Sequence, residues 1–225
     1  MYAMNVLSSI MPRAPRTQIA GGIYKVGSRG NGRRTLFHDA VAYELFLELL
    51  GASVVRFCWL CHTYCLMPNH FHLLIETPDA NISAGTQWLK GRYAQWFNKR
   101  NGQTGHVFEG RFYGEVVESD EHFVELVRYI LNNPVRAGLC ADASGWGWSS
   151  YRALVGDSKA PSFLTTERVL GQFGRDPRMA REELRRFVLR LPSEDADERW
   201  RPVPRPQGLT PGQTLVGRLG DQPKP

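Results

Sequence analysis

One short stretch decides how this chain folds and what it can do: Pro68-Asn69-His70-Phe71-His72-Leu73-Leu74. In a β-strand successive side chains point to opposite faces, so His70 and His72 share one face while Phe71 points to the other. Two imidazoles at this spacing can bind a single divalent metal ion. The alternative is a half-buried strand that carries two histidines and no metal. Residues farther along the chain bear on that choice.

A helix expected over residues 120–132 supplies a partner for this strand. It opens on two carboxylates, which suit the positive end of a helix dipole, and an apolar stripe follows at helical spacing. Tyr129 falls to one side of that stripe, and Asn133 lies one turn farther along on the same face as Tyr129. Pro134 disfavours helical geometry at Asn133, so we expect both groups at the end of the helix, above the histidine strand.

These residue types together favour one chemistry. A tyrosine hydroxyl can attack a phosphodiester in line, which forms a phosphotyrosine and releases a 3′-hydroxyl. A metal held by His70 and His72 would polarise the phosphate under attack. Asn133 offers a hard oxygen that can complete the protein ligands, and this mixed nitrogen and oxygen set fits Mg²⁺ or Mn²⁺. Without the histidines, an amphipathic surface tyrosine would be the better interpretation of Tyr129.

Composition and charge narrow the class of protein. The 225 residues are 42% hydrophobic, enough for one domain with appendages and a core that needs no disulfides. The net charge is +6 and most basic residues are arginines, which favours phosphate contacts, although a basic domain can also be simply soluble. No run approaches the ~20 apolar residues of a membrane span, and the N-terminus is a poor signal peptide. We expect a cytoplasmic protein that associates with the nucleoid when bound to DNA.

Three of the four cysteines lie close together and form a misleading pattern. Cys58-Trp59-Leu60-Cys61-His62 matches the pattern for c-type haem attachment, and with Cys65 it hints at zinc. In the strand expected here positions 58 and 61 fall on opposite faces, and haem attachment would require export. We therefore interpret the cysteines as small core residues in a reducing compartment.

The remaining pattern predicts alternating strands and helices. We expect strands over residues 22–26, 54–66 and 70–76, helices over residues 39–50 and 83–99, and two short helices over residues 165–173 and 177–191. The Gly- and Arg-rich turn 28–34 can cradle phosphate or be a solvated loop. The aromatic residues of helix 83–99 are expected to pack, with base stacking as the alternative. For the arginines of helix 177–191 we favour a solvated, ion-paired face over a grip on DNA.

Two longer blocks resemble the signatures of one family. Residues 64–74 are similar to the HUH signature of the single-tyrosine transposases of small insertion sequences. Residues 128–138 are similar to the tyrosine helix of that family, in the version typical of REP-associated tyrosine transposases. Further blocks agree with the same family at residues 28–31, 91–94, 105–112 and 148–151. The resemblance extends from Arg13 to Leu154.

The resemblance implies a fold, an activity and a site. It implies an α+β, ferredoxin-like HUH domain with a central antiparallel sheet and helices on one side. His70 and His72 would be metal ligands, Asn133 the third ligand and Tyr129 the nucleophile. The substrate would be single-stranded DNA at a hairpin, cut and rejoined without a nucleotide cofactor by a monomer or homodimer. The arginines expected to contact DNA are Arg29, Arg33, Arg34, Arg92, Arg111, Arg128 and Arg136.

The expected organisation has four segments. They are an N-terminal disordered extension (1–12), the transposase domain (13–158), a small helical extension (159–191) and a Pro-rich disordered tail (192–225). Within the domain, Lys25 stands where the family often has histidine, and Glu109 where it commonly has glutamine. A carboxylate at position 109 would repel phosphate unless it were paired, for example with Arg111.

Two functions of different classes follow from these features. The first is a transposase that nicks and rejoins DNA, and the second is a hairpin-binding protein that keeps the fold without useful cleavage. The complete set of His70, His72, Tyr129 and Asn133 favours the enzyme, because binding alone does not need it. Relaxases and rolling-circle replication initiators share the two-histidine and tyrosine logic, but the sequence around Tyr129 resembles the transposases more closely.

Overall fold

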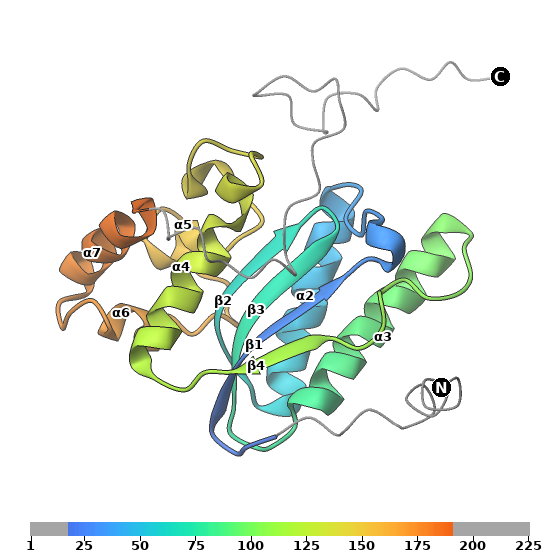
Figure 1. Cartoon of the computed structure of the whole chain (residues 1–225), viewed down its shortest axis with the longest axis horizontal. Helices are drawn as coiled ribbons and strands as arrows, with labels where there is room; N and C mark the ends of the chain where they lie inside the picture. The colour runs from blue at the N-terminus through green and yellow to red at the C-terminus, as the bar shows by residue number, and fades with distance from the viewer. Residues whose placement is uncertain (1–17, 191–225) are drawn as a thin grey trace, which may run out of the picture.

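A four-stranded antiparallel sheet forms the centre of the molecule. The structure is a computed structural model that describes residues 18–190. The strands are β1 (Gly22–Arg29), β2 (Leu60–Met67), β3 (His70–Thr77) and β4 (Tyr113–Val116), in the order β2-β3-β1-β4 (Figure 1). Helix α2 (Ala40–Phe57) joins β1 to β2, and α3 (Ile82–Asn101) joins β3 to β4. The β-α-β-β-α-β path is that of a ferredoxin-like domain, so the expected α+β fold is confirmed.

Helices lie on both faces of this sheet. The long helices α2 and α3 run together behind it (Figure 1), and Phe71 of β3 points to them, with its ring centroid 4.8 Å from that of Phe46 in α2. Helix α4 (Asp120–Arg136) lies on the opposite face, where the ring centroids of Tyr129 and His72 are 5.6 Å apart. The expected pair of helices on one side is present, and α4 adds a cover on the other side.

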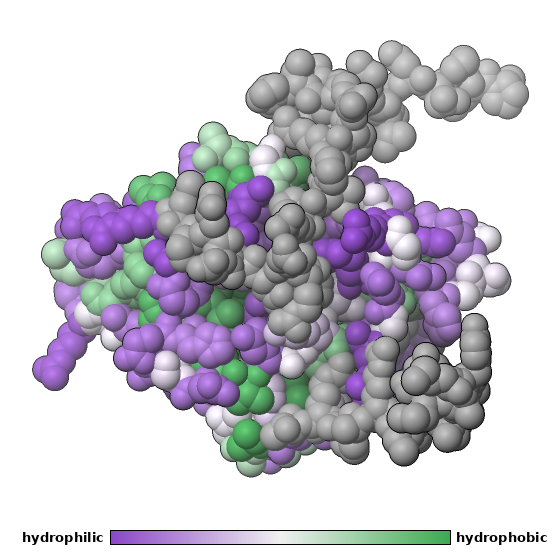
Figure 2. Space-filling view, viewed as in Figure 1, coloured by the Kyte–Doolittle hydropathy of each residue, from purple (hydrophilic) through white to green (hydrophobic). Residues whose placement is uncertain are grey.

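Short helices gather beside α4 at one end of the molecule (Figure 1). They are the 3₁₀ turn η2 (Ala143–Gly145) and the helices α5 (Tyr151–Leu154), α6 (Glu167–Gly171) and α7 (Pro177–Leu189). A further 3₁₀ turn, η1 (Asn31–Arg33), follows β1. Hydrophilic side chains and smaller apolar patches share the surface in the region of α6 and α7 (Figure 2).

The strand expected over residues 54–66 is corrected in its first part. Val54 to Phe57 continue α2, and the helix ends at Cys58, whose left-handed backbone has a φ of 53°. Val54 and Phe57 are half-buried against the core, and this packing outweighs the strand preference of a β-branched residue. Cys61 and Cys65 are buried as expected, but Cys58 is exposed and is no core residue.

Helix α4 also runs farther than expected, to Arg136, and contains Pro134 in its last turn. Proline removes one backbone donor, but the turn continues because the Ala137 N–H donates to the Asn133 carbonyl at 3.0 Å. The Asn133 side-chain amide donates to the Tyr129 carbonyl at 3.1 Å. Tyr129 and Asn133 therefore lie inside regular helix instead of at its frayed end.

Within residues 18–190, no helix combines the length and the apolar character that crossing a membrane requires. The expected N-terminal extension (1–12) and Pro-rich tail (192–225) lie outside the described residues.

Candidate active site

The two histidines of β3 lie side by side on the face of the sheet that α4 covers. His70 is 2% exposed, His72 is fully buried, and their ring centroids are 5.0 Å apart. In the sheet register His70 pairs with Arg29 and His72 pairs with Gly27 of β1. The glycine leaves the position beside His72 without a side chain. The strand periodicity inferred from the sequence thus places both imidazoles together.

A hydrogen-bond chain fixes which nitrogen of His70 carries the proton. The Asn69 side-chain amide donates to the Arg33 carbonyl at 3.1 Å, which turns the Asn69 carboxamide oxygen toward His70. His70 Nδ1 lies 2.7 Å from that oxygen, so Nδ1 must be the protonated donor. The lone pair of the ring is then on Nε2. A partner on the distal nitrogen is how metal-binding histidines are usually oriented.

Both imidazoles are held in the neutral form, which is the form that binds metal. Burial lowers the pKa of His70 to about 3, and the charge of Arg29 acts in the same direction, while the Asn133 side chain acts weakly against it. Burial also lowers the pKa of His72 well below its ordinary value. Electrostatic repulsion acts in the same direction and comes from His70 and from the nearby cations Lys25, Arg29 and Arg136. Protons therefore do not compete for these nitrogens near neutral pH.

Tyr129 reaches the histidine pair from α4. Its side chain is 8% exposed, and its ring meets the His72 ring edge-on. Two cations lie over the tyrosine ring, Lys25 Nζ at 4.3 Å and Arg136 Cζ at 5.2 Å from its centroid. Arg29 also interacts electrostatically with Tyr129. Positive charge around the phenol favours negative charge that develops there, on the oxygen or on a bound phosphate.

Lys25 is a site residue that sequence reasoning treated only as a departure from a family pattern. It is 3% exposed, and its Nζ lies 3.4 Å from the Glu115 carboxylate of β4. The Tyr113 hydroxyl donates to the same carboxylate oxygen at 2.8 Å, and His122 Nε2 lies 3.4 Å from the other. The available signal was strand alternation, because positions 25, 27 and 29 share the face of the histidines.

The structure separates the seven arginines expected to contact DNA. Arg29 and Arg136 lie at the histidine and tyrosine site. Arg33, Arg34 and Arg111 are exposed in the loops that follow β1 and precede β4. Arg92 lies over Trp88 on the outer side of α3, across the sheet from the site, and Arg128 pairs with Glu125 and faces α7. Arg92 and Arg128 therefore lie away from the histidine and tyrosine site.

Glu109 lies beside Arg29 at the end of β1. Its backbone N–H donates to the Arg29 carbonyl at 2.8 Å, and its carboxylate raises the pKa of Arg29 against the effect of burial. The carboxylate therefore acts on an arginine at the site. Glu109 sets part of the charge that a phosphate would meet beside the histidines.

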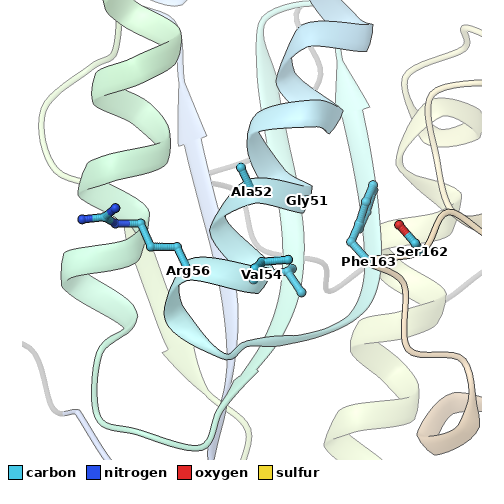
Figure 3. A pocket seen from close by; sticks show the side chains of 7 residues that line it. Gly51, Ala52, Val54, Arg56, Ser162 and Phe163 are labelled. Carbon is cyan, nitrogen blue, oxygen red and sulfur yellow. The ribbon is translucent and has the colours of Figure 1, made fainter.

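Other candidate sites in the described part of the chain are weaker. Among residues 18–190, no three His, Cys, Asp or Glu side chains converge on one position that could hold a metal ion. A shallow apolar pocket lies between the end of α2 and the loop before α6, and Gly51, Val54 and Phe163 are among the residues that line it (Figure 3). It is on the α2 side of the sheet, across from the histidines.

This combination of sheet, histidine pair and tyrosine helix defines the class of single-tyrosine HUH transposases. Residues 22–133 match the family described as IS200-like transposases, and the chain belongs to that family.

Two known proteins are similar to this chain, one in sequence and one in structure. A protein of Haemophilus influenzae named as a REP-associated tyrosine transposase is 24% identical over 102 residues, which span 40% of this chain and 58% of that protein. The solved structure of a REP-associated tyrosine transposase bound to a REP hairpin superposes with a TM-score of 0.57 and 19% identity, over 69% of this chain and 92% of that one. At this identity the structural match concerns the fold.

Proposed function

We propose that this protein cuts and rejoins single-stranded DNA at hairpins through a 5′-phosphotyrosine on Tyr129. The observation that carries the proposal is the edge-on contact between Tyr129 and His72, which brings nucleophile and histidine pair of one chain together. The solved relative bound to a REP hairpin supports hairpin DNA as the partner. The alternative is a hairpin-binding protein that does not cut.

The proposed metal ligands are His70, His72 and Asn133. Two neutral imidazole nitrogens and one amide oxygen suit Mg²⁺ or Mn²⁺, and the Asn69 contact leaves the His70 lone pair on Nε2 as metal binding requires. A divalent ion at this position supplies a Lewis acid that draws electron density from the scissile phosphate. The neutral state of both imidazoles supports this assignment.

The protein residues perform the transfer itself. Tyr129 Oη attacks phosphorus, and the bond between phosphorus and the 3′ oxygen breaks, so the downstream strand stays on tyrosine and the upstream strand leaves with a 3′-hydroxyl. The phenol loses a proton and the leaving oxygen gains one. Lys25, Arg29 and Arg136 offset the charge of the phosphate. A 3′-hydroxyl that attacks the phosphotyrosine reverses the step and rejoins the strands.

The test is covalent capture of DNA. We would incubate the protein and Mn²⁺ or Mg²⁺ with single-stranded hairpin oligonucleotides that carry randomised flanks. A label on the 3′ end should migrate with the protein on a denaturing gel, whereas a label on the 5′ end should appear in a shorter free strand. If no oligonucleotide in the pool yields an adduct, the protein is a binder and the enzyme proposal is wrong.

Matched variants assign the roles. Tyr129→Phe should abolish the adduct, and Tyr113→Phe, a second tyrosine on the same face, should retain it. Changing both His70 and His72 to alanine should abolish cleavage while hairpin affinity stays close to that of the wild type, because affinity rests on basic residues. An adduct that persists in Tyr129→Phe would contradict the nucleophile, and lost binding in the folded histidine variant would contradict the division of roles.

A further inference from the structure

The residues directly before Tyr129 and Asn133 face away from the site and contact α7. Arg128 and Asn132 are one helical turn apart, and each is rotated by about 100° from the residue that follows it. The helix therefore presents two neighbouring stripes. One stripe holds the proposed nucleophile and ligand against the sheet, and the other rests on the C-terminal extension.

Asn132 makes the more specific of these contacts. The Asn132 side chain is buried, with 3% of its surface exposed, and its Nδ2 donates a hydrogen bond to the Val188 carbonyl at 2.7 Å. Val188 lies in the last turn of α7, where carbonyl groups lack partners within the helix. The bond thus satisfies two buried polar groups at once, and neither can be moved without leaving the other unpaired.

Arg128 and the neighbouring helix α6 extend the contact along α4. The Arg128 guanidinium lies 4.7 Å from the ring centroid of Phe187, and its Nη1 donates to the Arg190 carbonyl at 3.4 Å. Toward the beginning of α4, Arg168 of α6 lies 3.5 Å from the Asp120 carboxylate. The extension therefore contacts α4 near both of its ends.

Two arginines of α7 have carboxylate partners. Arg185 forms a two-pronged pair with Asp157 at 2.8 and 3.0 Å, and Arg186 lies 2.7 Å from Glu183. These pairs agree with the ion-paired interpretation of the arginine row. Cations whose charge is already balanced are poor candidates for gripping a DNA backbone.

We propose that helices α6 and α7 hold the nucleophile helix in register, and that Asn132 is the positioning residue that transmits this support to Tyr129. The proposal rests on the proposed function of Tyr129 as nucleophile. It gives the extension expected over residues 159–191 a task in catalysis: it fixes the position of the phenol over the histidine pair. Small displacements of a reacting group are costly even when their origin is remote.

Two variants from opposite sides of the contact test the proposal. Asn132→Leu keeps the size of the side chain and removes the donor, and Phe187→Ala removes the ring beneath Arg128. In the full-length protein, each should lower the single-turnover rate of adduct formation by about 10- to 100-fold, with hairpin affinity changed by no more than about twofold. The fraction of active molecules is counted separately, from the amplitude of adduct formation with hairpin DNA in excess, so that a loss of folded protein does not mimic the effect.

Controls separate positioning from general stability. Phe187→Tyr keeps the ring and should restore the wild-type rate, and Arg186→Gln, on the outer face of α7, should leave it unchanged. Hydrogen–deuterium exchange should be faster in residues 129–136 of both disruptive variants and unchanged in α2. If Asn132→Leu misfolds, the rate of adduct formation in Phe187→Ala still tests whether α7 positions the nucleophile helix.

The outcomes distinguish this proposal from the proposed function. Wild-type cleavage with normal rates in both disruptive variants would overturn the positioning role and leave the enzyme intact. A wild-type protein that forms no adduct would overturn the enzyme, and unchanged exchange in α4 of the variants would then overturn the contact between extension and helix as well.

Discussion

At the scale of single residues, Lys25 places a cation on the face of the sheet that carries the histidine pair. Its Nζ lies over the Tyr129 ring and beside the Glu115 carboxylate. We expect Lys25→Met to lower the rate of adduct formation about a hundredfold, because it removes a fixed positive charge from the place where phosphate charge must be stabilised. The measurement is the single-turnover rate at saturating hairpin DNA.

The matched control for this variant is Lys25→Arg, which keeps the charge. Glu115 still receives the Tyr113 hydroxyl in both variants, so the fold around the carboxylate should persist. If Lys25→Met cleaves as fast as the wild type, Lys25 is only a structural partner of Glu115.

The buried histidines connect the stability of the protein to pH. Burial and nearby cations lower the pKa of His70 to about 3 and that of His72 well below its ordinary value, whereas both are about 6.5 in the unfolded chain. As the pH falls below that value, the unfolded chain takes up protons and the folded chain does not, so the free energy of unfolding falls. Between pH 7 and pH 5 the loss should be about 2 kcal/mol for each histidine.

Urea unfolding of the metal-free protein at several pH values measures this loss. A variant with glutamine at both His70 and His72 should show a flatter dependence over the same window. A double variant whose stability falls as steeply as that of the wild type would show that other groups govern the response.

At the scale of elements, α4 depends on its first turn as well as on its packing. The Ser119 side chain accepts a hydrogen bond from the His122 N–H at 3.1 Å, and Asp120 and Glu121 follow at the positive end of the helix. Ser119→Ala should lower the free energy of unfolding by about 1 kcal/mol, whereas Ser119→Asp keeps an acceptor and should retain most of it. Thermal or urea unfolding of the two variants compares them directly, and equal losses in both would argue against the cap.

Strong local patterns allowed most elements to be predicted from the sequence. Alternation in β3 and the apolar stripes of α3 and α4 fix which residues face the core, and these elements formed close to the expected positions. The errors fall where tertiary packing overrides local preference. Val54 has a strand-forming side chain yet lies in α2, and Pro134 continues a helix that it would end in isolation.

Some residues of the candidate site could be predicted from the sequence, and others are brought together only by the fold. His70, His72, Tyr129 and Asn133 stand in short motifs whose spacing carries their geometry. Lys25 and Glu115 lie 90 positions apart, and only the pairing of β1 with β4 brings them together. No periodicity within a single segment encodes such a pair. The seven arginines likewise look alike in sequence, and their different neighbours emerge only from the fold.

At the scale of the whole molecule, the Tyr129 ring meets the His72 ring of the same chain, so one chain is expected to be sufficient for cleavage. We would mix Tyr129→Phe with the variant that has alanine at both His70 and His72. The mixture should remain inactive, because neither chain can complete a site. Adduct formation in the mixture would show that the tyrosine works on the partner of a dimer.

The histidine pair lies in β3 and Tyr129 lies in α4, so the ribosome makes these two parts of the site at different times. A ribosome releases the polypeptide from its N-terminus, and domains acquire structure in that order. A nascent chain that has emerged as far as α3 already carries the histidine strand but has no tyrosine helix, and α7 follows later still. Translation products truncated before α4 should therefore be unable to form the proposed phosphotyrosine, because they lack Tyr129.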